Sequence, residues 1–413
     1  MTATSLFIVI LIFFIADFFL ERWLDYLNTI CWSNELPLEL KGIYDAEKYA
    51  KSQDYEKVKH NFSKLISIIS FLAMLTFLYF QGFAMVDKWV YSLSDNPIVI
   101  AILFFGVLGF VSDLLTLPFQ IYSQFVIEER FGFNKTTVRT FILDKLKSWL
   151  LAIIIGGGLL SLITWIYYST GSYFWIIAWA CLSLFTIFMN MFYSSLIVPL
   201  FNKQKPLEEG ELKDAIYDFA NNVGFKLENI FVIDGSKRSS KANAYFSGLG
   251  PKKRIVLYDT LIQNHSKEEL VAVLAHEIGH YKLKHTLQGM IVSVIYSGIL
   301  FFILSLFLGN PLLSQALGAS KGSFHMGIVA FGLLYTPISL LLGLVMNLAS
   351  RKNEFQADRY AVKNNQGDAL QNALIKLSVD NLSNLRPHPV YVFFYYSHPP
   401  LLMRLKQIKE TDK

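Results

Sequence analysis

Long apolar stretches dominate the pattern of hydrophobic and polar positions along this chain of 413 residues. A helix that crosses a bilayer needs about 20 mainly apolar residues. Seven stretches meet that requirement: Leu6–Leu27, Leu65–Val86, Ile98–Ile121, Trp149–Tyr168, Phe174–Val198, Gln288–Leu308 and Met326–Ala349. The pattern therefore predicts an integral membrane protein built mostly of α-helices. We expect the first stretch to be a retained span, because no basic residue precedes it and no small-residue cleavage site follows it.

Two polar segments lie outside these spans. The first, residues 201–285, has the periodicities of one helix and two short strands, expected at Glu208–Gly224, Asn229–Asp234 and Arg254–Tyr258. Another helix is expected from Ser266, because Ser266 and Glu269 have the spacing of a capping box. The second segment begins at Arg351 and predicts helices that end near Gln407.

The same pattern divides the chain into four parts. Residues 1–200 hold the first five spans and their loops, and residues 201–285 hold the polar segment with a small β-sheet and the capped helix. Residues 286–350 hold spans six and seven, and residues 351–413 form a C-terminal helical segment.

The basic residues predict the orientation of the spans. One side of the membrane would hold 35 of the 37 Lys and Arg residues, and the other side only Lys88 and Lys321. Basic loops stay in the cytoplasm, and the short loop Glu128–Lys147 alone carries five basic residues. We therefore expect the N-terminus outside, and both polar segments in the cytoplasm.

Composition supports a membrane protein and excludes two other classes. The chain is 53% hydrophobic and 17% charged, against about 25% charged in soluble domains, and its mean hydropathy is +0.40. The net charge of +5 is not accompanied by any nucleic-acid-binding motif. The two cysteines, Cys31 and Cys181, are too few for a disulfide framework or a cysteine-based zinc site.

The capped helix carries the sequence His276-Glu277-Ile278-Gly279-His280. Histidines at positions i and i+4 project from one face of a helix, where both can bind one metal ion. Zinc accepts imidazole nitrogens and, in catalytic sites, keeps one position for water. Glu277 is then the candidate general base that takes a proton from that water as it attacks a peptide carbonyl. The alternative is an amphipathic helix with incidental histidines.

A third metal ligand is required, and the metzincin pattern does not supply it. That pattern places glycine and histidine at fixed offsets after the motif, where this chain has Leu283 and Thr286. His285 is one residue away from the required position.

A glutamate from a later helix is the other solution. In Asn353-Glu354-Phe355-Gln356-Ala357-Asp358, Glu354 and Asp358 share one helix face. Glu354 can bind zinc, while Asp358 accepts the N–H of a ligating histidine, expected to be His276, and fixes its tautomer. The alternative is an ordinary exposed pair of acidic residues.

Two loop residues are candidates for holding the substrate. Asn243 could bind a substrate backbone or the developing oxyanion, and His398 could supply a second contact to that oxyanion. The other histidines are expected at the surface or the membrane interface, with no assigned role: His60, His265, His285, His325 and His388.

Six motifs together resemble the type I CAAX prenyl endopeptidases, a family of membrane-integral gluzincins, over nearly the whole chain. They are EERFGFNKTT (Glu128–Thr137), SKRSSKANAYFSGL (Ser236–Leu249), RIVLYDTL (Arg254–Leu261), LAHEIGHYKLKH (Leu274–His285), NEFQAD (Asn353–Asp358) and SHPPLLMRL (Ser397–Leu405). The resemblance implies seven helices around a large, barrel-like intramembrane chamber that a zinc site closes on the cytoplasmic side. It also implies removal of the last three residues from prenylated CAAX proteins.

The resemblance carries roles onto individual residues. It implies one zinc ion held by His276, His280 and Glu354, with Glu277 as the base. It places Asp358 and Arg404 around the ligands, and Asn243 and His398 beside the substrate. The expected partners are a peptide or protein substrate, including a prenylated CAAX C-terminus, and the lipid bilayer; no nucleic acid is expected, and we expect a monomer.

Two features favour a bacterial inner-membrane member over a protein of the endoplasmic reticulum. The loop Gly309–His325 is short, and the ending Lys409–Lys413 has no retention signal. Two alternatives remain open at this point. One is a quality-control zinc protease of the heat-shock type, and the other is a scaffold or transporter that keeps the protease fold without activity.

Overall fold

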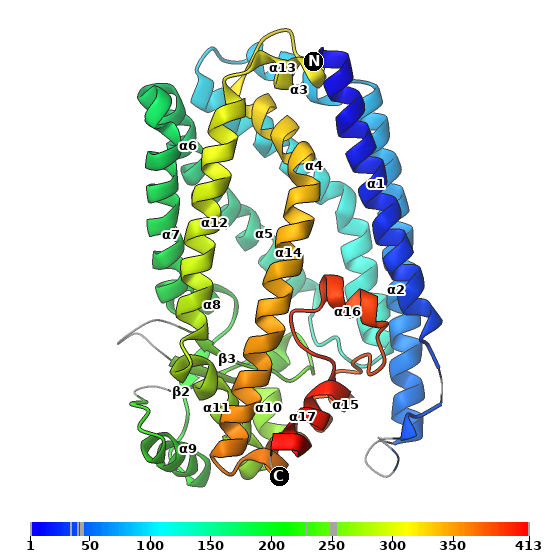
Figure 1. Ribbon diagram of the computed structural model, residues 1–413, viewed down its shortest axis with the longest axis vertical. Coiled ribbons are helices and arrows are strands. Elements are labelled where there is room, and N and C mark those ends of the chain that lie inside the picture. The colour runs from blue at the N-terminus through cyan, green and yellow to red at the C-terminus, as the bar shows by residue number, and fades with distance from the viewer. Residues whose placement is uncertain are drawn as a thin grey trace.

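The computed structural model describes residues 2–33, 35–38, 41, 45–227, 230–247 and 254–411. Long helices run along the longest axis of the molecule (Figure 1). The N-terminus lies at one end of this axis, and the C-terminus lies at the other end beside a small sheet and several short helices. The two ends of the molecule therefore have different structures.

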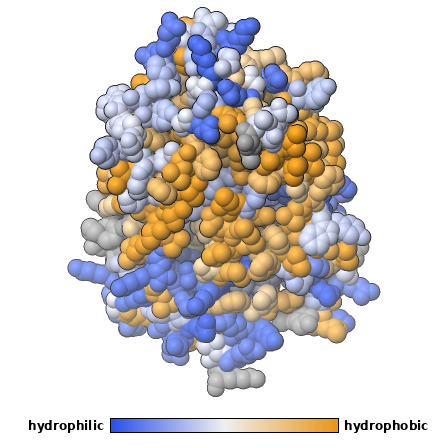
Figure 2. Space-filling model, turned by 45° about the horizontal axis from the view of Figure 1, so that its top comes forward, coloured by the Kyte–Doolittle hydropathy of each residue, from blue (hydrophilic) through white to orange (hydrophobic). Residues whose placement is uncertain are grey.

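Six helical stretches of the described chain are long and apolar enough to cross a membrane. They are Ala3–Ile30 (α1), Ala46–Tyr79 (α2), Pro97–Glu128 (α4, Pro97–Tyr122, with η2, Ser123–Glu128), Val138–Phe201, His285–Leu308 (α12) and Phe324–Lys363 (α14). Figure 2 shows an apolar belt between two polar ends. Within these stretches Ile153, Ile295 and Leu341 are 71%, 56% and 62% exposed, and a continuous belt of exposed apolar side chains is typical of a surface that contacts a membrane.

The stretch Val138–Phe201 contains two of the predicted spans. Its elements are α5 (Val138–Leu151), η3 (Ala152–Gly156), α6 (Gly157–Thr170), η4 (Gly171–Tyr173), α7 (Phe174–Leu196) and α8 (Val198–Phe201). The chain turns at Gly171, which has a φ of 53°, and α6 packs against α7.

The second predicted span, Leu65–Val86, was wrong at its end. Helix α2 ends at Tyr79, and a separate helix, α3 (Gly82–Tyr91), follows. Gln81 adopts the left-handed conformation between them, and a Cβ on Gly82 would lie 2.3 Å from the Phe77 ring. Glycine is therefore needed for this turn, which an apolar sequence pattern does not reveal.

A four-stranded sheet lies at the C-terminal end, with the order β1-β2-β4-β3. The strands are β1 (Gln204–Pro206), β2 (Ile230–Ile233), β3 (Ala244–Ser247) and β4 (Arg254–Tyr258). The strands β2 and β4 were predicted. Asn229 of the first predicted strand lies outside the described residues, as do Gly248 and Leu249 of the motif Ser236–Leu249. Strand β3 pairs antiparallel with β4 from Ala244 opposite Leu257 to Ser247 opposite Arg254, and it forms one edge of the described sheet.

Short helices complete this end and the opposite one. They are α9 (Glu211–Asn222), η5 (Gly235–Lys237), α10 (Asp259–Asn264), α11 (Lys267–Lys282), α13 (Pro311–Ala316), α15 (Gly367–Asp380), α16 (Pro389–Tyr395) and α17 (Leu401–Thr411). The capping box before α11 is confirmed: Ser266 Oγ accepts from Glu269 N, and Glu269 Oε2 accepts from Ser266 N. Helix α11 is buried from Leu270 to His276 in the larger hydrophobic core.

Helices α11 and α14 pack closely where Gly279 faces α14. A Cβ on residue 279 would lie 3.2 Å from the backbone Cα of Ala357 and 3.1 Å from Tyr360 Cβ. Ala357 is fully buried, so neither helix has room to retreat locally. Glycine therefore permits an approach between the two helices that a larger residue would prevent.

We predict that Gly279→Ala lowers the free energy of unfolding by about 1–3 kcal/mol, because the added methyl meets backbone that cannot move aside. Thermal unfolding of the detergent-solubilised protein measures the effect. The matched control is Gly289→Ala, since a Cβ there has nothing within 4 Å. Equal melting temperatures for both variants would contradict the packing argument.

Candidate metal centre

Two helices bring three candidate metal ligands together. His276 and His280 lie on one face of α11, and Glu354 lies on the facing side of α14. Their ligand atoms all lie within 4.8 Å of one another. His276 Nε2 is 3.1 Å from His280 Nε2, and Glu354 Oε1 is 3.2 Å from His280 Nε2. The three side chains thus converge on one point.

The donor set fits a divalent metal such as zinc. Glu354 Oε2 is buried and has no partner in full hydrogen-bond geometry among the described residues, although His276 Nε2 and Arg404 Nη1 lie 3.4 and 3.5 Å from it. A carboxylate oxygen in that state is costly unless a cation or a donor compensates it. Two imidazoles and one carboxylate, with space beside them, also form the ligand set of catalytic zinc sites.

A second layer of side chains holds the ligands. His276 Nδ1 lies 2.9 Å from Asp358 Oδ1, which leaves Nε2 facing Glu354. Arg404, on α17, donates from Nε and Nη2 to the two oxygens of Asp358 at 2.8 and 2.6 Å. A bidentate pair of this kind fixes the carboxylate and, through it, the histidine tautomer.

Charge balance in this layer shifts several pKa values, among them those of His276 and Arg404. Burial opposes protonation of His276, but its hydrogen bonds to Asp358 and Glu354 outweigh burial and raise the pKa to about 9. Burial likewise disfavours the charged Arg404, and its bonds to Asp358 outweigh burial and raise the Arg404 pKa.

The sequence missed a further residue in this layer, His285. Its Nδ1 lies 3.0 Å from His280 Nδ1, and its Nε2 lies 2.9 Å from Gln356 Oε1. Gln356 belongs to α14, between Glu354 and Asp358. Only its position five residues after His280, in the first turn of a new helix, could have indicated this contact.

The expectation that the unassigned histidines are surface or interfacial residues was wrong for three of them. His265, His285 and His325 are 7%, 6% and 2% exposed. Each of these histidines has a specific polar partner. His265 Nδ1 contacts Leu261 O in the preceding short helix, and His325 Nε2 contacts Asp87 Oδ1, which is distant in sequence.

A cleft of about 510 Å³ opens beside the three ligands. Glu277, Asn243 and His398, the predicted base and the two candidate substrate contacts, all line it. His398 is largely exposed, and its Nε2 lies 3.3 Å from Glu354 Oε1. Asn243 immediately precedes the edge strand β3, and its Oδ1 accepts a hydrogen bond from Ala244 N at 2.8 Å.

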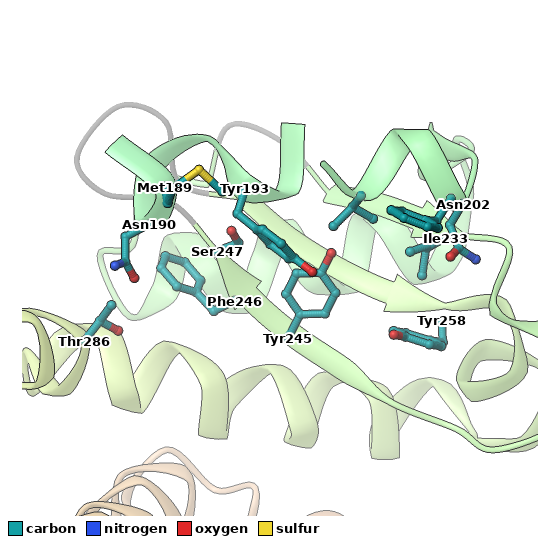
Figure 3. A pocket seen from close by; sticks show the side chains of 12 residues that line it. Met189, Asn190, Tyr193, Asn202, Ile233, Tyr245, Phe246, Ser247, Tyr258 and Thr286 are labelled. Carbon is teal, nitrogen blue, oxygen red and sulfur yellow. The ribbon is translucent and has the colours of Figure 1, made fainter. Parts of the chain in front are cut away.

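A second pocket of about 590 Å³ adjoins this cleft (Figure 3). Tyr245, Phe246 and Thr286 line both spaces. The side chains of Tyr193 and Tyr258 add hydroxyl groups, and the lining contains no charged residue. Strand β3 therefore borders two adjoining spaces that differ in the charge of their linings.

The motif Glu128–Thr137 fixes the segment that leads to Asn243. Glu128 Oε2 accepts from Lys241 Nζ at 2.8 Å, and Tyr55 Oη contacts both Glu128 Oε1 and Lys241 Nζ, at 2.5 and 2.8 Å. The side-chain amide of Asn381 pairs with the backbone N–H and C=O of Ala242 at 3.2 and 3.3 Å. Two motifs distant in sequence thus hold one loop beside the cleft.

Arg351 holds the other side of the cleft. Its guanidinium is buried and donates to the backbone carbonyls of Val392, Phe393 and Tyr396, at the end of α16. The next residues are Ser397 and His398. The direction of this loop therefore depends on a cation on α14, only three residues before Glu354.

Two family models match the chain in tandem. Residues 26–203 match the CAAX prenyl protease N-terminal model, described as five membrane helices, and residues 206–412 match peptidase family M48. With the apolar helices and the ligand cluster, these matches define a multi-pass membrane metallopeptidase.

Similar proteins match over almost their full lengths. The CAAX prenyl protease 1 homolog of Arabidopsis thaliana is 36% identical over 97% of each chain, and CAAX prenyl protease 1 of Saccharomyces cerevisiae is 37% identical over 95% of this chain and 93% of its own. The crystal structure of S. mikatae Ste24p covers 98% of this chain, and this chain covers 99% of Ste24p, with 36% identity and a TM-score of 0.92. The chain belongs to the CAAX prenyl protease 1 family.

The expected bacterial inner membrane finds no support in these relatives, which are eukaryotic proteins. The short loop Gly309–His325 folds into α13 and packs against α14, so its length reflects compact packing and does not distinguish the source.

We predict that His285→Phe lowers metal affinity by about 10–100-fold, because it removes the ring nitrogen that contacts His280 while keeping a ring of similar size. Competition with a chelator measures the affinity. The control is His60→Phe. His60 packs on Trp32, is distant in sequence from the metal-ligand cluster and does not contact that cluster. Unchanged affinity in His285→Phe would show that the contact does not orient His280.

Proposed function

We propose that this protein is a zinc metalloendopeptidase that cleaves peptide bonds near the C-terminus of prenylated CAAX-like substrates. The observation that carries this proposal is the convergence of His276, His280 and Glu354 on one wall of a cleft that also contains Glu277. Family membership supports the substrate class, since the relatives are CAAX prenyl proteases by name.

Zinc bound by the three ligands would supply a Lewis acid and lower the pKa of the attacking water. Glu277 follows His276 on the same helix and lines the cleft, so its carboxylate can take a proton from that water. The same carboxylate then delivers the proton to the departing amine. Asp358 and Arg404 keep His276 in the tautomer that presents Nε2 to the ligand site.

His398 and Asn243 are the proposed contacts to the developing oxyanion. Both line the cleft, and they approach it from different segments. His398 Nε2 lies 3.3 Å from Glu354, so an imidazole N–H can reach a substrate oxygen next to the ligand cluster. Asn243 lies at the start of the edge strand, where its amide can bind the substrate backbone.

Strand β3 supports an extended binding mode for the peptide. It forms the edge of the described sheet and borders the cleft through Ala244, Tyr245 and Phe246. An extended peptide can pair with such an edge by β-augmentation. The adjoining uncharged pocket would then take substrate side chains beyond the cleft.

We further propose seven membrane spans around an intramembrane chamber, with the metal centre on the cytoplasmic side and a monomeric chain. The turn at Gly171–Tyr173 supports counting the stretch Val138–Phe201 as two spans. The charge asymmetry of the loops supports the orientation.

We predict that Glu277→Gln retains zinc but loses cleavage, with kcat reduced by about 100–10,000-fold, the contribution typical of a general base. The assay compares wild type and variant in detergent on a farnesylated CAAX peptide and its unprenylated twin. Metal analysis of both proteins is the control for an intact site. Full activity in Glu277→Gln would rule out its role as the base.

The same assay separates the alternatives. Cleavage of the prenylated peptide alone supports a CAAX-type protease. Equal cleavage of both peptides keeps the protease but favours general quality control of membrane proteins. Metal binding without cleavage of either peptide would favour a different substrate or a non-catalytic scaffold.

We predict that His398→Ala lowers kcat by about 100-fold or more with little change in KM, because a contact to the oxyanion acts in the transition state. The control is His60→Ala, which removes a histidine outside the cleft. A rise in KM at constant kcat would instead assign His398 to ground-state substrate binding.

A further inference from the structure

The end of the molecule opposite the metal centre contains a pocket of about 580 Å³ between α3 and the residues after α13. Lys88, on α3, and Lys321 both line it. The predicted topology places 35 of the 37 Lys and Arg residues on the cytoplasmic side of the membrane. Lys88 and Lys321 are the two that it places on the opposite side. Both exceptions to the charge asymmetry therefore share one pocket.

Neither lysine has an ion-pair partner among the residues that the structure describes. Asp87 also lines the pocket, but it is buried, and its Oδ1 lies 2.6 Å from His325 Nε2. The Asp87 carboxylate therefore already has a partner, the buried side chain of His325. The pocket has two exposed ammonium groups and no exposed carboxylate in its lining, so its electrostatic character favours an anion.

The walls of the pocket are held in place by packing. Phe83 and Val90 of α3 belong to a buried cluster with Leu313 and Leu317 of the opposite wall. Gly318 has a φ of 88°, and a Cβ there would lie 2.8 Å from Gln81 Oε1. The two walls therefore touch at a position that requires glycine, and the lysines extend from a rigid base.

The surroundings of the pocket match a membrane–water interface. Two residues separate helix α3 from the end of α2, a helix long and apolar enough to span a bilayer. Helix α3 lies at the end of the molecule away from the C-terminus (Figure 1). Tyr79, Phe80 and Trp89 are 77%, 62% and 48% exposed. Aromatic side chains collect at the level of lipid headgroups, where apolar and polar surroundings meet.

We propose that this pocket binds the phosphate group of a phospholipid headgroup in the leaflet opposite the metal centre. Lys88 and Lys321 contact the phosphate from the two walls, and the apolar rim formed by Phe80 and Met85 contacts the glycerol and the first carbons of the acyl chains. Charge-assisted contacts from two lysines suit a phosphate, and the apolar rim distinguishes a lipid from a free anion. This site is independent of the peptidase reaction.

The test measures binding of dihexanoyl phosphatidylglycerol to the full-length protein in detergent by native mass spectrometry. Because a lysine near a membrane surface contributes about 1 kcal/mol, Lys88→Gln with Lys321→Gln should weaken binding about thirtyfold, at 1.4 kcal/mol per tenfold. The matched control is Lys48→Gln with Lys51→Gln, which removes two exposed lysines at the start of α2 and should leave binding unchanged.

Two further probes identify the ligand chemistry. Dihexanoylglycerol, which lacks the phosphate, should not bind to the site, and inorganic phosphate alone should bind much more weakly than the lipid. Equal lipid binding by the Lys88/Lys321 variant and the wild type would overturn the proposal. So would inorganic phosphate that binds as tightly as the lipid with the same lysine dependence, since the site would then be one for a free anion.

Discussion

The close approach of α11 and α14 is the constraint on which the metal centre depends. Gly279 lies between the two motif histidines in this contact, and the facing residues Ala357 and Tyr360 follow Glu354 within two helical turns. Helices at ordinary spacing keep their axes about 8–10 Å apart, and a short carboxylate must still reach two imidazoles. Gly279 therefore allows the two helices to pack closely and, as a result, keeps the metal ligands on them within reach of one another.

Electrostatics determines which further elements must join this pair. Glu354 and Asp358 are buried carboxylates, and burying such charges is costly unless they are paired and hydrogen-bonded. Arg404 compensates Asp358 from α17, so the last helix that the structure describes becomes part of the centre. Arg351 works differently, because its buried charge is satisfied by backbone carbonyls and so directs a loop instead of neutralising an acid.

The sequence predicted the parts of this structure that depend on local patterns. The capping box at Ser266 and the helical spacing of Glu354 and Asp358 are such patterns. The bounds of strand β3 could not be predicted, because four half-buried residues in a polar segment carry little periodicity. The contact of His285 with this site was not predicted, because its partner Gln356 is 71 residues away in the sequence. The turn at Gln81 was not predicted, because apolar residues lie on both sides of it in the sequence. These features depend on tertiary contacts, which a single sequence does not reveal.

The length of α14 places the ligand cluster close to the end of an apolar stretch that is long enough to cross a membrane. Between His325 and Arg351 the helix has 25 residues without an acidic or basic side chain, about 37 Å at 1.5 Å per residue, enough to cross a hydrocarbon core of about 30 Å. Glu354 follows Arg351 by three residues, or about 5 Å along the helix. The ligand cluster therefore lies near the level where apolar surroundings give way to water. Under the proposed function, the lipid group of the substrate stays in an apolar environment there, while the peptide bond beside it reaches both the metal ligands and the water that hydrolysis consumes.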